Sequence, residues 1–362
     1  MEILGFIINF IILLFWTLLY QRKMICYSTH GIIFFADNSI AYLHDKYHTI
    51  CVPFAQKKTF STKRDLTITA SFYGEKHLPL TLFSIRQSGC MATIVVLTNK
   101  EMKFSAFTTK LMNCLSVRVI GAHISDWLKK HHTDFIRDMF VCNFAKLYRN
   151  EFDRIFFFDA FDVFFEHDPF EYFEDDHIFF FRESMVPIRK DRWNKLWINS
   201  CYGDETLKRL GNNLIVCSGT VAGSINMFIK FYELIQKQES WNRCGADQGQ
   251  INYAIYSGLL DRNNISYVLF DQAGPVHTLV LGTKHYKHYF NNSKYLYVTN
   301  AKDEVAAVLH QHKKVKPVMI GLYNRCNFTK VNQICKSDSS EVKYFQYLNL
   351  SSFDDQEMNI TV

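Results

Sequence analysis

The 362-residue sequence lacks the patterns that identify several common classes of protein. Its ten cysteines include no C-x-x-C pair and no zinc-type spacing, which argues against a structural zinc site. No dense run of Lys or Arg is interleaved with aromatic residues, and the net charge of +6 is mild, so nucleic acid is not the favoured partner. There is no internal repeat and no low-complexity segment. With 48% apolar and 16% aromatic residues, the chain has ample material for a buried core.

The longest apolar run lies at residues 3–20, where Asn9 and Thr17 are the only polar positions. Eighteen residues just span a bilayer, and no small-x-small cleavage site follows, so we predict a transmembrane signal anchor. Arg22 and Lys23 follow the run, and the positive-inside rule would leave the C-terminal side in the cytosol. The even number of cysteines and five N-x-S/T sites favour a lumenal domain instead. These sites are Asn264, Asn291, Asn327, Asn349 and Asn359.

We therefore predict a single-pass type II protein of the Golgi or endoplasmic reticulum membrane. Its parts are an anchor at 1–23, a stem at 24–64, a catalytic domain at 65–336 and a polar, loosely ordered tail at 337–362. Cys326 and Cys335 lie close in sequence and would close a loop in an oxidising compartment; free thiols are the alternative.

The domain alternates strand-like and helix-like segments, which predicts an α/β fold with a mostly parallel sheet and helices on both faces. Small residues at 214–224 predict a turn after a short strand. Strands are expected at 66–72, 92–98, 116–120, 155–158, 177–182, 214–216, 267–270 and 305–310, and helices at 78–87, 135–150, 225–238 and from 247.

The most informative stretch is RIFFFDAFDVFFEHDPF at 154–170, where a short apolar strand is followed by Asp159 and then by Asp162. Carboxylates at the exit of a buried strand sit at the edge of an α/β sheet where ligands bind. Two close carboxylates repel each other unless a cation lies between them, which indicates a divalent metal. The structural alternative is a strand end capped by solvated aspartates.

Three further patterns point to a ligand site, each with an ordinary structural alternative. Ser218-Gly219 would let the backbone approach a ligand closely, although glycine-rich turns are common. Asp247-Gln248 opens a predicted helix, where Asp is also a good N-cap. His310 ends a short apolar run, and a lone His is usually structural.

Taken in order, these motifs resemble the GT-A glycosyltransferases, in particular the glycogenin-like family 8 group and its nucleotide-diphospho-sugar transferase relatives, over residues 65–317. The resemblance implies that Asp159, Asp162 and His310 bind Mn²⁺ or Mg²⁺. It places Ser218-Gly219 beside the donor sugar and Asp247-Gln248 near the anomeric carbon and the acceptor. It brings the strand from Thr69 to Tyr73 against the base and ribose, and makes Lys146 a basic contact to the donor. The donor-binding residues so implied are Thr69, Ala70, Ser71, Tyr73, Lys146, Ser218 and Gly219.

The sequence departs from the family pattern at two places. The family acidic motif is D-x-D, whereas this chain has D-x-x-D, which leaves open which of Asp159 and Asp162 binds the metal directly. In the late motif, Lys313 stands at the usual Gly position and Val318 follows Pro317, which puts the diphosphate clamp in doubt.

The expected function is transfer of a sugar from a nucleotide diphosphate donor, UDP-linked, to a hydroxyl of a glycan, protein or lipid. The resemblance implies retention of configuration, with the leaving phosphate accepting the proton; Asp247 would be the general base of an inverting enzyme. One alternative is a non-catalytic membrane-anchored carbohydrate- or nucleotide-sugar-binding protein on the same fold. A haloacid dehalogenase-type phosphatase ranks low, because its acidic pair is D-x-D on the first strand of the domain.

Overall fold

The computed structural model describes residues 58–99, 101–122, 124, 133–173, 176–238, 247–272, 274–279, 289–290, 297–299, 304–326, 328–330, 335 and 344–348. The predicted anchor and nearly all of the predicted stem lie outside these residues. Within the described part, no helix combines the length and the apolar character that crossing a bilayer requires. The transmembrane prediction therefore stays a prediction.

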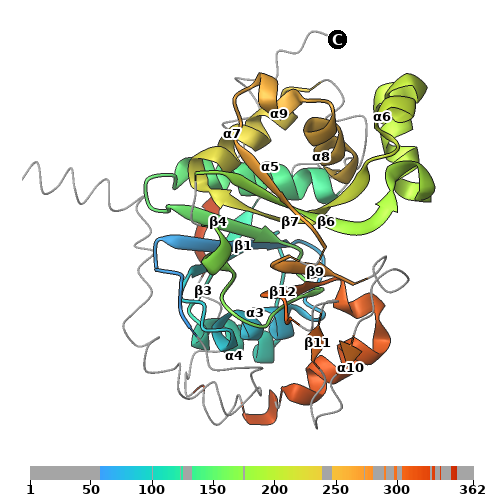
Figure 1. The fold of residues 1–362 in the computed structure, drawn as a ribbon. Helices are drawn as coiled ribbons and strands as arrows, with labels where there is room; N and C mark the ends of the chain where they lie inside the picture. Colours follow the sequence, from blue (N-terminus) through green and yellow to red (C-terminus); the bar gives the residue numbers. More distant parts are fainter. Residues whose placement is uncertain are drawn as a thin grey trace, which may run out of the picture. The chain divides into compact units, whose positions relative to one another are not determined.

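An eight-stranded sheet forms the centre of the domain, in the order β13-β3-β2-β1-β4-β7-β6-β8 (Figure 1). All neighbouring strands run parallel except at β7, which is antiparallel to both β4 and β6. This confirms the predicted α/β class with a mostly parallel sheet. The strands are β1 Asp65–Ser71, β2 Thr93–Asn99, β3 Val117–Ala122, β4 Arg154–Phe158, β6 Ile178–Pro187, β7 Leu214–Ser224, β8 Tyr267–Phe270 and β13 Tyr344–Leu348.

Helices cover both faces of this sheet, with α5 and α7 on one side and α3 and α4 on the other (Figure 1). Local sequence sets where several of them begin: the Ser105 side chain caps α4, and the Ser224 side chain caps α7. The helices are α3 Leu78–Gln87, α4 Ala106–Cys114, α5 Thr133–Leu147, α6 Arg192–Leu210, α7 Ile225–Gln236, α8 Asp247–Tyr256, α9 Leu259–Arg262 and α10 Lys316–Arg325. Short 3-10 turns are η2 Pro169–Tyr172, η3 Ile188–Lys190, η5 His312–Lys314 and η6 Phe328–Lys330.

A second, three-stranded sheet in the order β5-β12-β9 lies apart from the main one. It consists of β5 Val163–Phe165, β12 Val308–His310 and β9 Val276–Thr278, and a separate pair joins β10 Tyr289–Phe290 to β11 Val298–Thr299. The late strand predicted at 305–310 therefore belongs to this small sheet. Its antiparallel partner is β5, which follows the acidic turn directly.

Strand β4 is buried on both faces, as expected of a central strand in a sheet covered by helices. Phe156 and Phe158 point into the main core cluster, while the Phe157 ring meets Phe228 and Tyr232 of α7. The abundance of phenylalanine is therefore used for packing. On α5, Phe140 and Phe144 are fully buried, whereas Leu147 at the end of the helix is 51% exposed.

Three predictions from the sequence are corrected by the structure. The stretch of small residues at 214–224 is not a turn: all of it is strand β7, because β4 and β6 flank it on either side. The polar tail contains an edge strand, β13, which pairs with β3. Cys335 forms a disulfide with Cys114 rather than with Cys326, since the fold brings α4 to it across 221 residues of sequence.

Candidate metal and ligand site

Asp159 and Asp162 lie on the short turn that connects β4 of the main sheet to β5 of the small sheet. Asp159 follows the last residue of β4, and Asp162 precedes the first residue of β5. The backbone N–H of Asp159 donates to the carbonyl of Gly219 in β7 at 2.8 Å. The turn is therefore held by a strand at each end and by the neighbouring strand β7.

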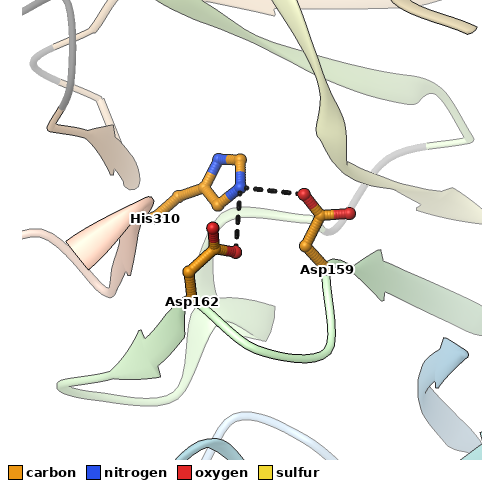
Figure 2. Close-up of side chains that lie close together, drawn as sticks. All are labelled: Asp159, Asp162 and His310. Carbon is orange, nitrogen blue, oxygen red and sulfur yellow. Dashed lines mark hydrogen bonds and ion pairs between the residues drawn. The ribbon is translucent and has the colours of Figure 1, made fainter. Parts of the chain in front are cut away.

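His310 reaches this turn because β12 pairs with β5. The antiparallel register sets His310 opposite Val163, next to Asp162. The Nε2 atom of His310 lies 3.3 Å from Oδ2 of Asp159 and 3.7 Å from Oδ1 of Asp162 (Figure 2). One ligand atom from each residue falls within 4.8 Å of the others. The structure thus brings together the three residues that the sequence motif and the family resemblance single out.

In each of the two carboxylates, one oxygen forms an ion pair with a basic side chain of the protein and the other oxygen faces His310. Oδ1 of Asp159 pairs with the Arg137 guanidinium, and Oδ2 of Asp162 pairs with Lys313 at 3.1 Å. The other oxygen of each acid is the one that approaches Nε2 of His310. The D-x-x-D spacing therefore does not remove either carboxylate from the cluster.

The cluster fits a divalent cation. Oδ1 of Asp162 is buried and makes no hydrogen bond within the described part of the chain, which leaves a lone pair for a ligand. A Cβ placed on Gly219 would lie 2.6 Å from Cε1 of His310 and would overlap the Asp159 carboxylate, so only glycine fits beside the cluster. Two carboxylates with one imidazole form a ligand set that Mn²⁺ accepts; Mg²⁺ prefers the oxygens.

Arg137 of α5 connects this cluster to Asp247 at the start of α8. Its guanidinium pairs with Asp159 and Asp247, and its Nε lies 3.3 Å from Asp138. Burial alone would lower the pKa of Arg137, but the three acids hold it well above its ordinary value. Burial raises the pKa of Asp247 to about 6, against the opposing effect of Arg137.

The side chain of Gln248 lies at the centre of a second, buried polar network. Its Oε1 accepts from the backbone N–H of Ser218 at 3.3 Å, and its Nε2 donates to Glu183 at 2.8 Å and to Asn194 at 3.1 Å. Gln311, the residue after His310, donates to the other Glu183 oxygen at 3.1 Å. Burial raises the pKa of Glu183, which these two amides oppose.

The residues that the resemblance assigns to the nucleotide lie at the carboxyl end of β1, beside β4. The Thr69 hydroxyl donates to the carbonyl of Phe158 at 2.6 Å, and the Ser71 hydroxyl donates to the carbonyl of Gly74. Ala70 is half-buried, and Tyr73 is 64% exposed just beyond the strand. Their placement puts them at the same sheet edge as Asp159; a nucleotide contact stays a prediction.

Lys146, which the resemblance makes a basic contact to the donor, lies in the last turn of α5, and its contact to a donor stays a prediction. Its ammonium pairs with Glu233 of α7 at 2.8 Å. It comes nine positions after Arg137 on the same helix, a rise of about 13.5 Å along the axis. The basic side chain of α5 that reaches the acidic cluster is therefore Arg137.

The residues of these networks that sequence reasoning missed include Arg137, Glu183, Asn194 and Gln311. Glu183 had a readable signal, because it comes one residue after the apolar run at 178–181, as Asp159 comes directly after the apolar run of β4. The other three lie in polar or mixed surroundings that give no period or motif. Only the packing of α5, α6 and β12 around β7 brings them to the site.

No protein-family model and no curated protein sequence matches the chain. Among solved structures, it is similar to a glycosyltransferase involved in the glycosylation of the major capsid of PBCV-1. The match has 10% sequence identity and a TM-score of 0.38, and covers 72% of this chain and 98% of that chain. At that level of similarity, the function has to be argued from the site.

Proposed function

We propose that the chain is a glycosyltransferase that uses a divalent cation to bind a nucleotide diphosphate sugar, UDP-linked, and transfers the sugar to a hydroxyl. The observation that carries this proposal is the Asp159–Asp162–His310 cluster at the exit of β4. Open α/β sheets bind ligands at this edge. Mn²⁺ or Mg²⁺ held there would act as a Lewis acid on the leaving diphosphate.

Residues of the chain supply further charge beside the cluster. Lys313 pairs with Asp162 while its side chain stays 38% exposed, so its ammonium is free to turn to a phosphate oxygen. The family has glycine at this position of the late motif. Lys313 would therefore add a cation beside the diphosphate rather than remove a contact to it. Gly219 has no side chain, so the β7 backbone lies directly against Asp159 and His310 of the cluster.

The arrangement around Asp247 supports retention of configuration. One Asp247 oxygen pairs with Arg137 and the other accepts from the backbone N–H of Gln248 at 2.7 Å. With these partners in place, neither Asp247 oxygen is turned toward a substrate hydroxyl. The leaving phosphate would then take the proton, and Gln248 would contact the sugar. In an inverting enzyme, Asp247 would have to leave Arg137 to act as general base.

The test is hydrolysis and binding of donors by the purified full-length chain. We expect slow hydrolysis of at least one UDP-sugar in a donor panel, dependent on Mn²⁺ or Mg²⁺ and abolished by a chelator. Metal-dependent UDP binding without hydrolysis would favour the non-catalytic nucleotide-sugar-binding alternative. Absence of both binding and hydrolysis across the panel would reject the proposal.

We further propose that the domain lies in the lumen of the Golgi or endoplasmic reticulum, attached through residues 3–20. The Cys114–Cys335 disulfide supports an oxidising compartment, and Cys201 and Cys326 are also disulfide-bonded. Asn264 of the sequon Asn-Ile-Ser is exposed after α9. Glycosidase treatment should shift the mobility of the expressed protein, and Asn264→Gln should reduce the shift. An unchanged mobility would count against the lumenal assignment.

A further inference from the structure

Helix α6 exposes large apolar side chains on its outward side. Trp193 is 54% exposed and Leu196 is 51% exposed, and Met185, just before the helix, is 44% exposed. Within the described residues, these are three of the seven large apolar side chains that are exposed. Trp193 and Leu196 are three residues apart and therefore lie on the same side of α6, while Met185 lies near the end of β6, seven residues before the helix.

The inward side of the same helix is already packed. Asn194 and Ile198 are buried, and Ile198 belongs to a small core cluster with Ile188 and Ile215. Asp191 caps the helix, because its Oδ1 accepts from the backbone N–H of Asn194 at 2.8 Å. A helix anchored on one side normally presents polar residues on the other. Trp193 and Leu196 break that rule: the Trp193 ring stacks on the Trp197 ring, yet both Trp193 and Leu196 stay more than half exposed.

The same surface is strongly basic. Arg189, Lys190, Arg192 and Lys195 are all exposed, and the single acid between 185 and 196 is Asp191, whose carboxylate is engaged in the helix cap. The Arg192 guanidinium lies 5.4 Å from the centre of the Trp193 ring. The basic–apolar face is defined here as Met185, Arg189, Lys190, Arg192, Trp193, Lys195 and Leu196.

We propose that the basic–apolar face docks on a phospholipid bilayer. Its cations match headgroup phosphates, while Trp193 and Leu196 reach the boundary between headgroups and acyl chains. A sugar ring would stack on Trp193 but leave Leu196 and Met185 in water, so a bilayer covers more of the face than a glycan does. The anchor predicted at residues 3–20 would keep the domain within reach of a membrane.

Docking there would hold the proposed site next to the membrane. Asn194, one residue after Trp193, accepts from the Gln248 side chain at 3.1 Å. A Cβ on Gly249, the residue after Gln248, would lie 2.9 Å from Cβ of Trp197. The first turns of α6, which carry most of the basic–apolar face, are thus in direct contact with α8, the helix proposed to bind the sugar. The acceptor would then be a hydroxyl on a lipid or lipid-linked molecule, a consequence that rests on the proposed transferase function.

The test places a photo-crosslinking residue, p-benzoylphenylalanine, at position 196 of the full-length chain in lipid nanodiscs. Position 320 is the matched control, since Ile320 is 45% exposed on α10, outside the basic–apolar face. We expect a lipid adduct at position 196 that increases when phosphatidylglycerol replaces part of the phosphatidylcholine, and background yield at position 320. A folded protein without an adduct at position 196, or with equal yield at 320, would overturn the proposal.

A charge variant tests the basic component separately. Lys190→Gln with Lys195→Gln should lower the adduct yield at position 196 several-fold, whereas Lys208→Gln with Arg209→Gln, exposed near the other end of α6, should leave it unchanged. Equal yields in the two pairs would contradict an electrostatic contact. Lipid adducts do not depend on sugar transfer, so donor hydrolysis in detergent separates failure of docking from failure of the proposed function.

Discussion

At the scale of single residues, the acidic turn is organised by cations that the chain itself supplies. Arg137 holds one oxygen of Asp159 and Lys313 holds one oxygen of Asp162. The two remaining oxygens face the same nitrogen of His310. Both acids are therefore positioned before any ligand arrives, and each has one oxygen that a metal can take.

Asp159→Asn should weaken Mn²⁺-dependent UDP binding by more than about 100-fold, because loss of a direct ligand exceeds the 10- to 100-fold cost of losing an outer-shell partner. Isothermal titration with and without Mn²⁺ measures it. The matched control is Asp153→Asn, which removes an exposed acid whose partner is Arg64. Unchanged metal-dependent affinity in folded Asp159→Asn would remove this residue from the site.

Gly219→Ala should disrupt the site through its added methyl group alone. The new Cβ would meet the His310 ring at 2.6 Å and overlap the Asp159 carboxylate, and overpacking of this kind costs about 1–3 kcal/mol. Chemical denaturation and UDP titration should both report the loss. Gly74→Ala is the control, because a Cβ there meets no atom within 4 Å. If the two variants behave alike, the close approach at β7 does not matter for binding.

Arg137→Met should destabilise the protein by about 3–5 kcal/mol, because it leaves buried acids without their cation. The acids concerned are Asp138, Asp159 and Asp247. Urea unfolding without metal measures the loss. Arg64→Met, which breaks an exposed ion pair with Asp153, should cost less than about 1 kcal/mol. A loss at position 137 as small as that at position 64 would show that the acids are not held in this way.

At the scale of elements, the network around Gln248 joins α8 to β6, α6 and the residue after β12. Its members come from five separate segments, since Ser218 of β7 also belongs to it, so none of them shows the link in its local sequence. Glu183 of β6 is its one carboxylate, and burial raises the pKa of that group. The network should therefore make stability depend on pH.

Glu183→Gln should flatten the decrease of stability with rising pH. An acid whose pKa is raised by folding stabilises the native state below its unfolded pKa of about 4.3, and this contribution is lost as pH rises through the folded pKa. Urea unfolding at a series of pH values measures the slope. Glu205→Gln, at a side chain 88% exposed on α6, should leave the slope unchanged. An identical slope in wild type and Glu183→Gln would contradict a pKa of Glu183 that folding raises.

At the scale of the whole molecule, the Cys114–Cys335 disulfide ties the segment after α10 to α4 across 221 residues of sequence. Cys335→Ala should lower the free energy of unfolding by about 2–5 kcal/mol, since the cross-link restricts the unfolded chain. Denaturant titration measures it. Cys114→Ala and the double variant should show the same loss, because either change breaks the same bond. A double variant much less stable than either single variant would indicate that the two cysteines act separately.

The α/β class could be predicted because apolar, β-branched segments alternate with helical periods along the chain. Strand β4 and its two acids could be located because the change from Phe158 to Asp159 is abrupt. The antiparallel strand β7 was misread as a turn, since small residues in a buried strand look like a glycine-rich loop. The edge strand β13 was missed because its pairing with β3 joins segments more than 220 residues apart.

The sequence by itself determined the fold class and the residues of the acidic cluster, because these are recorded locally as period, strand exit and order of motifs. Only the tertiary structure decided what surrounds the cluster. The pairing of β5 with β12 sets His310 against the acids, and α5 turns Arg137, rather than Lys146, toward them. Such contacts depend on the register between distant strands and on the rotation of a helix over the sheet. The residues next to Asp159, Asp162 or His310 in the sequence determine neither the register nor the rotation.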